Sequence, residues 1–261
     1  TQMSMLAERN LYFDARDDIG AFMNPGFDDS AWENATPVGV AGQLPFGALY
    51  SAIIDPIRFY EISDFSNAGD YVGKELTEDT TLELVLPGNI QFTPYFELEA
   101  PAGKRLTIYT DSYVDSDNNP NFKDTYVTAE GAQQFENFAW RSGSKLYIEA
   151  EAGVKFTALG YRKSEFNGKW VGTFTSENEE LNQLWQESLN TVAICMRDTY
   201  IDCPERERGP YMGDASNQID AALYGYDQGG LDMTKKAILS CLGWTPESGA
   251  IPSRAPSVKH Q

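Results

Sequence analysis

The feature that most constrains this chain is a change of periodicity near residue 172. Between Thr81 and Phe174, short runs of alternating apolar and polar residues follow one another, and Pro-Gly, Ala-Glu-Gly, Ser-Gly and Asn-Gly segments separate many of them. Because successive side chains of a strand point to opposite faces of a sheet, evenly spaced alternating runs predict an antiparallel β-sandwich. From Ser176 onwards the apolar residues recur at helical spacing instead. We therefore expect a multi-domain β + α chain.

The helical part begins at a predicted capping box, Ser176-Glu177-Asn178-Glu179. In such a box the serine oxygen accepts from a backbone N–H, and the glutamate reaches back. The apolar residues that follow form one stripe, which predicts a helix with a buried face: Leu181, Leu184, Trp185, Leu189, Val192 and Cys195. Residues 215–226 and 232–242 predict two further helices. The expected division is a β-sandwich domain over residues 1–172 and a helical domain over residues 173–261.

Composition narrows the chemistry that the chain can perform. The formal net charge is −19, which argues against nucleic acid and anionic membranes as partners, and no apolar run is long enough to cross a bilayer. The single histidine, His260, lies at the C-terminal end, so triad catalysis and histidine-rich metal sites are excluded. The three cysteines show no paired spacing and are interpreted as free thiols. Catalysis therefore falls to carboxylates, and neither a cofactor nor a metal is expected.

Residues 200–214 carry the densest charge, reading Tyr-Ile-Asp-Cys-Pro-Glu-Arg-Glu-Arg-Gly-Pro-Tyr-Met-Gly-Asp. Pro204 and Pro210 break helical continuity, so we expect a rigid, irregular loop that holds carboxylates and guanidiniums in fixed positions. The alternative is a solvated loop in which Arg206 and Arg208 neutralise neighbouring acids, with Asp214 as an ordinary cap of the following helix.

The run Asp202-Cys203-Pro204-Glu205-Arg206-Glu207-Arg208, followed by Gly213-Asp214, resembles the signature loop of inverting α-L-rhamnosidases, glycoside hydrolase family 78. Weaker similarities to the sheet of those enzymes occur at residues 104–131 and 160–162. The resemblance implies a catalytic α/α toroid of six helical hairpins, which needs on the order of 200 residues. Fewer than half of that follow Ser176, so we expect the sandwich and the first helices of a truncated toroid.

The resemblance also assigns roles. Glu207 matches the general acid, and Asp202 and Asp214 match carboxylates that hold sugar hydroxyls and favour the protonated acid. An arginine pointing at Glu207 would act the opposite way, so at least one of Arg206 and Arg208 is expected to pair with Glu205 or Asp202. The general base matches no segment here, so the chain alone is expected to be inactive.

Candidate substrate-binding residues lie in this loop and further along the chain. They are Arg206, Tyr211 and Trp244, the two aromatic rings serving as an apolar platform for the sugar, with core packing as their alternative. The expected partner is a rhamnose-containing plant glycoside or polysaccharide. Two other functions stay open: a lectin-like carbohydrate-binding protein, and a toroid glycosidase of another sugar specificity.

Three further features carry less weight. Residues 111–124 form a loop rich in Asp and Asn, in which Asp115, Asp117 and Asn119 imitate a calcium loop. Because Pro120 occupies the glycine position of such a loop and Tyr126 its glutamate position, a solvated turn is predicted for the whole segment. Trp32, in a Phe-Asp-Asp-Ser-Ala-Trp turn similar to those of glycosidase accessory domains, is interpreted as a core residue that anchors the turn. No signal peptide is visible at Thr1; a secreted or periplasmic protein is expected, with a cytoplasmic one left open.

Overall fold

The computed structural model describes residues 10–20, 22–43, 47–112, 114, 115, 117 and 119–255. The chain forms two compact units, one made by residues 17–52 and the other by the residues before and after them. In the smaller unit Trp32 packs against Phe27 and Phe22, with ring centroids 5.5 and 6.5 Å away. Trp32 anchors the turn as expected, but it is 53% exposed and therefore not a core residue.

All the described strands and helices lie in the larger unit, apart from Asp17 at the end of the first 3-10 turn. Its strands are β1 (Tyr12–Asp14), β2 (Arg58–Asp64), β3 (Thr80–Ala100), β4 (Arg105–Thr110), β5 (Asp124–Val127), β6 (Gly131–Glu136), β7 (Arg141–Ala150) and β8 (Lys155–Glu165). Its helices are α1 (Glu179–Ile194), α2 (Met212–Gly225) and α3 (Gln228–Gly243), with short 3-10 turns at Ala15–Asp17, which ends in the smaller unit, and Ala68–Asp70. The β + α fold class is as predicted; the domain division at residue 172 stays a prediction.

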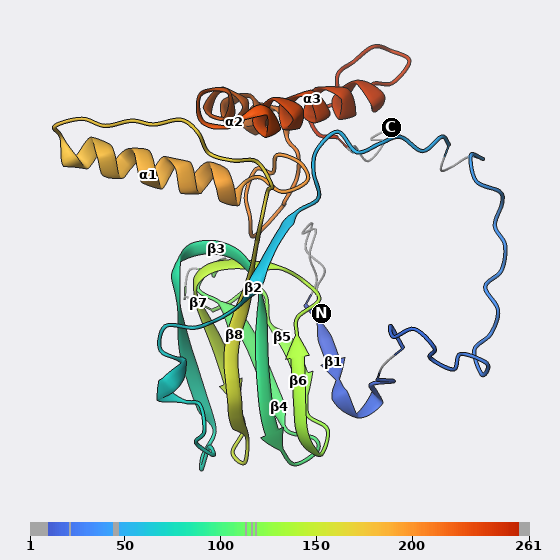
Figure 1. Cartoon of the computed structure of the whole chain (residues 1–261), viewed down its shortest axis with the longest axis vertical. Helices are drawn as coiled ribbons and strands as arrows, with labels where there is room; N and C mark the ends of the chain where they lie inside the picture. Colours follow the sequence, from blue (N-terminus) through green and yellow to red (C-terminus); the bar gives the residue numbers. More distant parts are fainter. Residues whose placement is uncertain are drawn as a thin grey trace. The chain divides into compact units, whose positions relative to one another are not determined.

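The strands form one hydrogen-bonded sheet that curls over on itself (Figure 1). Their order is β1-β5-β4-β7-β3-β8-β2, with β6 also paired to β3. The first part of β3 pairs with β7 and the second part with β8 and β6, so this one strand runs through both layers. Among the described strands, each pair is antiparallel except β1 with β5, which is parallel.

Strand β3 corrects one expectation. The Pro87-Gly88 segment is predicted to separate two strands, yet β3 continues through it for 21 residues. Its register against β7 shifts between Val85 and Ile90, which is where the strand bends. A proline within a strand removes one ladder hydrogen bond, and a bend with a register shift is a place where that loss is tolerated.

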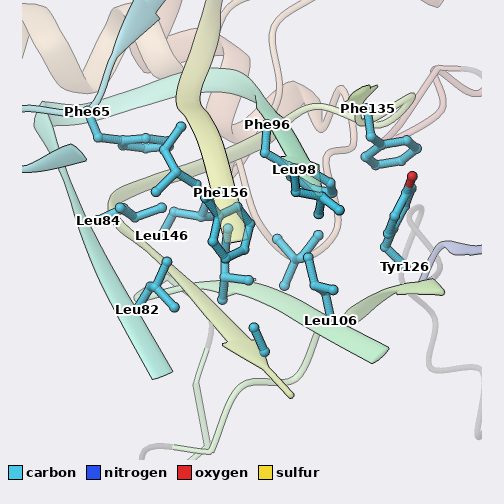
Figure 2. Close-up of a cluster of buried hydrophobic side chains, with 14 of the residues drawn as sticks. Phe65, Leu82, Leu84, Phe96, Leu98, Leu106, Tyr126, Phe135, Leu146 and Phe156 are labelled. Carbon is cyan, nitrogen blue, oxygen red and sulfur yellow. The ribbon is translucent and has the colours of Figure 1, made fainter. Parts of the chain in front are cut away.

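The core lies between the two layers of the curled sheet. Alternate residues along each strand point inwards, and Leu82, Leu84 and Phe96 are fully buried. Figure 2 shows how leucines and aromatic rings from both layers meet, including Tyr126 and Phe156. Burial of this kind stabilises by about 1.5–3 kcal/mol for each large apolar side chain. The sandwich is thus a rigid base for the loops at its edges.

The helices form where helical spacing predicts them, but their ends differ. Asn178 caps α1, accepting from the Glu180 N–H at 2.9 Å, so Ser176 is not the cap. Asp227 caps α3 in the same way through Gly229, and the helix therefore starts four residues before its predicted start. No residue of α1 is buried, and Leu181 and Leu184 are exposed, so the first half of the predicted apolar stripe is not a core face. The end of the stripe does reach the core, because Val192 packs against a buried cluster and Cys195, just after the helix, is buried. Trp185 nevertheless packs against Trp170 and Phe174.

The described cysteines are free, as expected, with Cys195 and Cys241 buried. His260 lies outside the described residues. None of the described helices combines the length and the apolar character needed to span a membrane.

Candidate active site

The charged loop between α1 and α2 is closed by Asp202. The Asp202 N–H donates to the carbonyl of Gly209 at 2.9 Å, and the Gly209 N–H donates back to Asp202 Oδ1 at 2.8 Å. Residues 203–208 are thereby enclosed in a short irregular loop, as the two prolines predict. One carboxylate of the predicted site thus has a structural role.

Glu207 lies inside this loop with a quarter of its side chain exposed. Its Oε2 accepts from Arg206 Nε at 2.5 Å and from the Cys203 thiol at 3.1 Å. The Arg206 hydrogen bond is the largest cause that lowers the pKa of Glu207 to about 2. In this arrangement Glu207 is ionised at neutral pH, because Arg206 points at it.

A second carboxylate lies close to Glu207. One oxygen of Asp202, one of Glu207 and the sulfur of Cys203 all lie within 4.8 Å of one another. Partial burial raises the pKa of the Cys203 thiol, so the thiol stays protonated and donates. Asp202 and Glu207 are therefore brought together, as the sequence predicts.

Asp214 lies in the first turn of α2 and is exposed. The capping position itself is occupied by Tyr211, which makes no side-chain cap. A carboxylate in a first turn also interacts favourably with the helix dipole. Burial raises the pKa of the Cys195 thiol to about 12, and the charges of Glu205, Asp202 and Asp214 add to this effect.

The two aromatic candidates have different surroundings. The Tyr211 ring packs on Gly209, where an added Cβ would lie 2.6 Å from it, and Arg254 lies 5.4 Å from the ring centroid. Arg254 also donates to the Tyr211 hydroxyl at 3.3 Å. Trp244 follows the last turn of α3 and is 47% exposed. The structure therefore places Tyr211 at the end of the loop, whereas Trp244 belongs to the end of α3.

The sandwich contributes residues to this site that sequence reasoning missed. The Arg208 guanidinium lies over the ring of Trp140, 3.4 Å from its centroid, and Arg208 Nη2 donates to the Trp140 carbonyl at 3.2 Å. Ser142 Oγ donates to Glu205 at 2.9 Å. These partners are 63–68 residues apart in the chain, and nothing in their local sequence signals the contact.

Asp124, at the end of the predicted solvated turn, is also buried. Its carboxylate pairs with Arg141, the first residue of β7, with Nη2 to Oδ1 at 2.6 Å and both side chains almost fully buried. Elsewhere in the turn, Asp115 is exposed and accepts from the N–H groups of Asp117 and Asn119. The prediction of a solvated turn is therefore wrong for Asp124.

Cavity volume does not by itself select the charged loop. A groove of about 640 Å³ lies between the end of β8 and α1, lined among others by Arg58, Trp170 and Tyr226, and no predicted site residue lines it. The cavity that includes Glu205 and Arg208 measures only about 10 Å³. We place the candidate site at the loop because its carboxylates converge there, which the larger groove does not offer.

Comparison with known proteins finds a family match that includes this loop. Residues 169–261 match the family model of the bacterial alpha-L-rhamnosidase 6 hairpin glycosidase domain. A comparison with curated protein sequences finds none that matches.

Solved structures extend the similarity to the sandwich. A family 78 rhamnosidase of Bacillus sp. GL1 is 25% identical over 68% of this chain and 19% of its own, with a TM-score of 0.61. The α-L-rhamnosidase of Dictyoglumus thermophilum is 23% identical over 94% of this chain and 28% of its own, with a TM-score of 0.75. The Streptomyces avermitilis α-L-rhamnosidase, solved with L-rhamnose, is 18% identical over 97% of this chain and 25% of its own, with a TM-score of 0.72. This chain thus spans between a fifth and three tenths of these proteins.

The described chain is thus a curled β-sandwich joined to helices, with two carboxylates brought together in the loop between α1 and α2. Over residues 169–261 the chain is similar to the hairpin domain of bacterial α-L-rhamnosidases, and over most of its length its fold is similar to that of solved α-L-rhamnosidases, one of them in glycoside hydrolase family 78.

Proposed function

We propose that this chain supplies the acid-bearing part of an inverting α-L-rhamnoside hydrolase. The observation that carries the proposal is the convergence of Glu207, Asp202 and Arg206 in one loop, inside the segment that matches the rhamnosidase domain. The substrate is a glycoside or polysaccharide with terminal rhamnose. Glu207 protonates the glycosidic oxygen as the bond breaks.

Glu207 must be protonated to act as an acid, and its contact with Arg206 opposes this. The Arg206 side chain is 56% exposed, so the pair is screened by water and moving the guanidinium away costs little. When Arg206 turns away from Glu207 and donates to a sugar hydroxyl instead, Asp202 is the charged group that stays close to Glu207. The neighbouring carboxylate raises the pKa of Glu207, so Glu207 takes up a proton again. Arg206 thereby has the substrate-binding role that the sequence predicts.

Asp202 does not have the spacing of an inverting base. The two carboxyls of inverting enzymes are about 6.5–9.5 Å apart, which leaves room for the attacking water. One oxygen of Asp202 lies within 4.8 Å of Glu207, and Asp202 Oδ1 already accepts from Gly209. Asp202 therefore tunes and holds the site, and the base comes from residues outside this chain.

The test is hydrolysis of an aryl α-L-rhamnoside by the full-length gene product, wild type beside Glu207→Gln. A missing general acid lowers kcat by about 10²–10⁴-fold. Glu187→Gln, on the exposed face of α1, is the matched control and keeps wild-type activity. The first sugar anomer released, followed by NMR, should be the inverted one. Unchanged turnover in Glu207→Gln would show that Glu207 is not the general acid.

The lectin-like alternative predicts a different result from the same proteins. Rhamnose would bind wild type and Glu207→Gln equally, and neither would hydrolyse the glycoside. A glycosidase of another specificity would turn over a different aryl glycoside and would lose that activity with Glu207→Gln.

A further inference from the structure

The backbone directly after Glu207 adopts an uncommon conformation. Arg208 has φ of +49°, and among the described residues it is the one non-glycine residue with positive φ. Residues with a Cβ rarely adopt this left-handed region, and they do so where their surroundings enforce it. The direction in which Glu207 leaves the backbone therefore depends on what holds Arg208.

Arg208 is held at two points. Its Nε donates to the Pro204 carbonyl at 2.7 Å, which ties it across the loop. Its guanidinium stacks on the indole of Trp140 at 3.4 Å from the ring centroid, well inside the range of a cation–π contact. A planar guanidinium can stack on a ring and donate hydrogen bonds at the same time. The second of these points belongs to the sandwich.

Trp140 is itself fixed by buried charges. The next residue, Arg141, forms the buried pair with Asp124 and also donates to the Trp140 carbonyl at 3.2 Å. Asn137 Nδ2 adds a hydrogen bond to Asp124 at 2.7 Å. Because these groups are almost fully buried, they hold the backbone of Trp140, from which the indole extends to the loop.

Other contacts hold the same interface. Arg197, just beyond α1, lies 4.4 Å from the Trp140 centroid and donates to Gln91 at 2.6 Å. Gln91 is buried in β3 and donates in turn to the carbonyl of Ile194 at 2.6 Å. On the other side of Glu207, Ser142 holds Glu205. The sandwich therefore contacts the loop on both sides of Glu207, at Glu205 and at Arg208.

We propose that Trp140 is a positioning residue for Glu207. It holds Arg208 in its left-handed conformation, and Arg208 fixes the backbone from which Glu207 extends. The sandwich is then part of the working site and not only an accessory domain. This role rests on the proposed function of Glu207, but the clamp itself is testable without any activity.

The test follows the hydrogen bond that closes the loop, from the Gly209 N–H to Asp202. Hydrogen exchange by NMR on the 261-residue chain compares wild type with Trp140→Leu and Trp140→Phe. Leucine removes the aromatic face, so exchange at Gly209 should accelerate by about tenfold or more, because the loop opens locally. Phenylalanine keeps an aromatic face and should restore most of the protection. Trp32→Leu, in the separate unit, is the matched control and should leave Gly209 unchanged.

Exchange at Leu84 in the sandwich core separates positioning from general destabilisation. It should stay as in wild type in every variant. Arg208→Gln removes the cation and leaves the sandwich untouched, so it should accelerate Gly209 in the same way even if Trp140→Leu fails to fold. Unchanged exchange at Gly209 in Arg208→Gln, or equal acceleration at Leu84, would overturn the clamp.

Kinetics of the full-length product then test the link to catalysis. Trp140→Leu should lower kcat by about tenfold with KM little changed, because an interaction needed in the transition state is misplaced. Faster Gly209 exchange with unchanged kcat would overturn the positioning role. Faster exchange in a protein whose wild type hydrolyses no rhamnoside would instead confirm the clamp and reject the proposed function.

Discussion

The sandwich and the helices differ in how far their apolar side chains are buried. In the sandwich, large residues such as Leu84 and Phe156 are completely buried. In the helices, the buried residues are mostly small, α1 buries none, and Leu184 and Tyr224 are 60% and 81% exposed. The sandwich therefore has a closed core, whereas the helices expose apolar faces of the kind that normally contact other protein surface. Stability should reside in the first region and association in the second.

The largest effect is expected from opening the sandwich core. Phe156 is fully buried and meets Phe96 edge to face at 6.1 Å. Phe156→Ala should lower the free energy of unfolding by about 3–5 kcal/mol, because it removes burial and leaves a cavity. Urea denaturation measures this loss. Leu184→Ala on α1 is the matched control, and it should lower the free energy of unfolding by less than about 1 kcal/mol. Equal losses in both variants would remove the difference between the regions.

The next effect tests the buried charges beneath Trp140. Arg141→Met leaves Asp124 buried with its charge uncompensated, which typically costs about 3–5 kcal/mol. The Asp124 carboxylate keeps hydrogen bonds from Leu11 and Asn137, so we expect the lower end, about 3 kcal/mol. Urea denaturation of Arg141→Met beside Arg105→Met, on exposed Arg105 of β4, measures it. A loss below 1 kcal/mol would show that the pair does not anchor the sandwich edge.

The same comparison shows what the sequence can predict. Alternation with period two is local, so the strands and the inward residues of the sheet were predictable. The break expected at Pro87-Gly88 was wrong because pairing with distant strands decides whether β3 continues. The predicted starts of α1 and α3 were wrong because Asn178, and not Ser176, caps α1, and because Asp227 caps α3 ahead of Gly229 and Gly230, which favour a later start. The error in β3 arises because the turn signal is local, whereas the strands that pair with β3 lie far away in the sequence.

The candidate site divides along the same line. The loop itself was predictable, because its prolines and its charges lie within a few residues of one another. That Arg206 contacts Glu207 was not, since neighbours in sequence can point in several directions. Trp140 and Ser142 were beyond prediction, because a contact across more than 60 residues depends on how the sheet curls. The roles of Glu207, Asp202, Asp214, Arg206, Tyr211 and Trp244 stay predictions.

A smaller effect concerns the Arg206–Glu207 pair. The folded pKa of Glu207, about 2, lies below the usual unfolded value of about 4.3, so the ionised form stabilises the fold. This contribution is fully present above about pH 4.3 and is lost as pH falls towards 2. Because Arg206 is largely exposed, we expect no more than about 1 kcal/mol.

Arg206→Gln removes the stabilisation that the Arg206–Glu207 pair contributes, so comparing it with wild type measures that contribution. Thermal or urea unfolding of wild type and Arg206→Gln should differ by up to about 1 kcal/mol at pH 7, and the difference should shrink between pH 4.3 and 2. Arg105→Gln, in the sandwich, is the control for loss of a surface cation. A difference that grows on acidification would contradict the pairing.

The smallest effect on stability, and the sharpest on association, is expected at the helices. Leu184 and Leu242 are both more than half exposed, so replacing them together with glutamine should change the free energy of unfolding by at most about 0.5 kcal/mol for each residue. Removing apolar surface that faces water should nevertheless reduce self-association, as measured by sedimentation velocity at rising concentration. Thr80→Gln with Thr107→Gln, on the outer side of the sheet, is the control. A loss of several kcal/mol would mean that these leucines are buried in solution, and the contrast between a closed sandwich and open helices would fail.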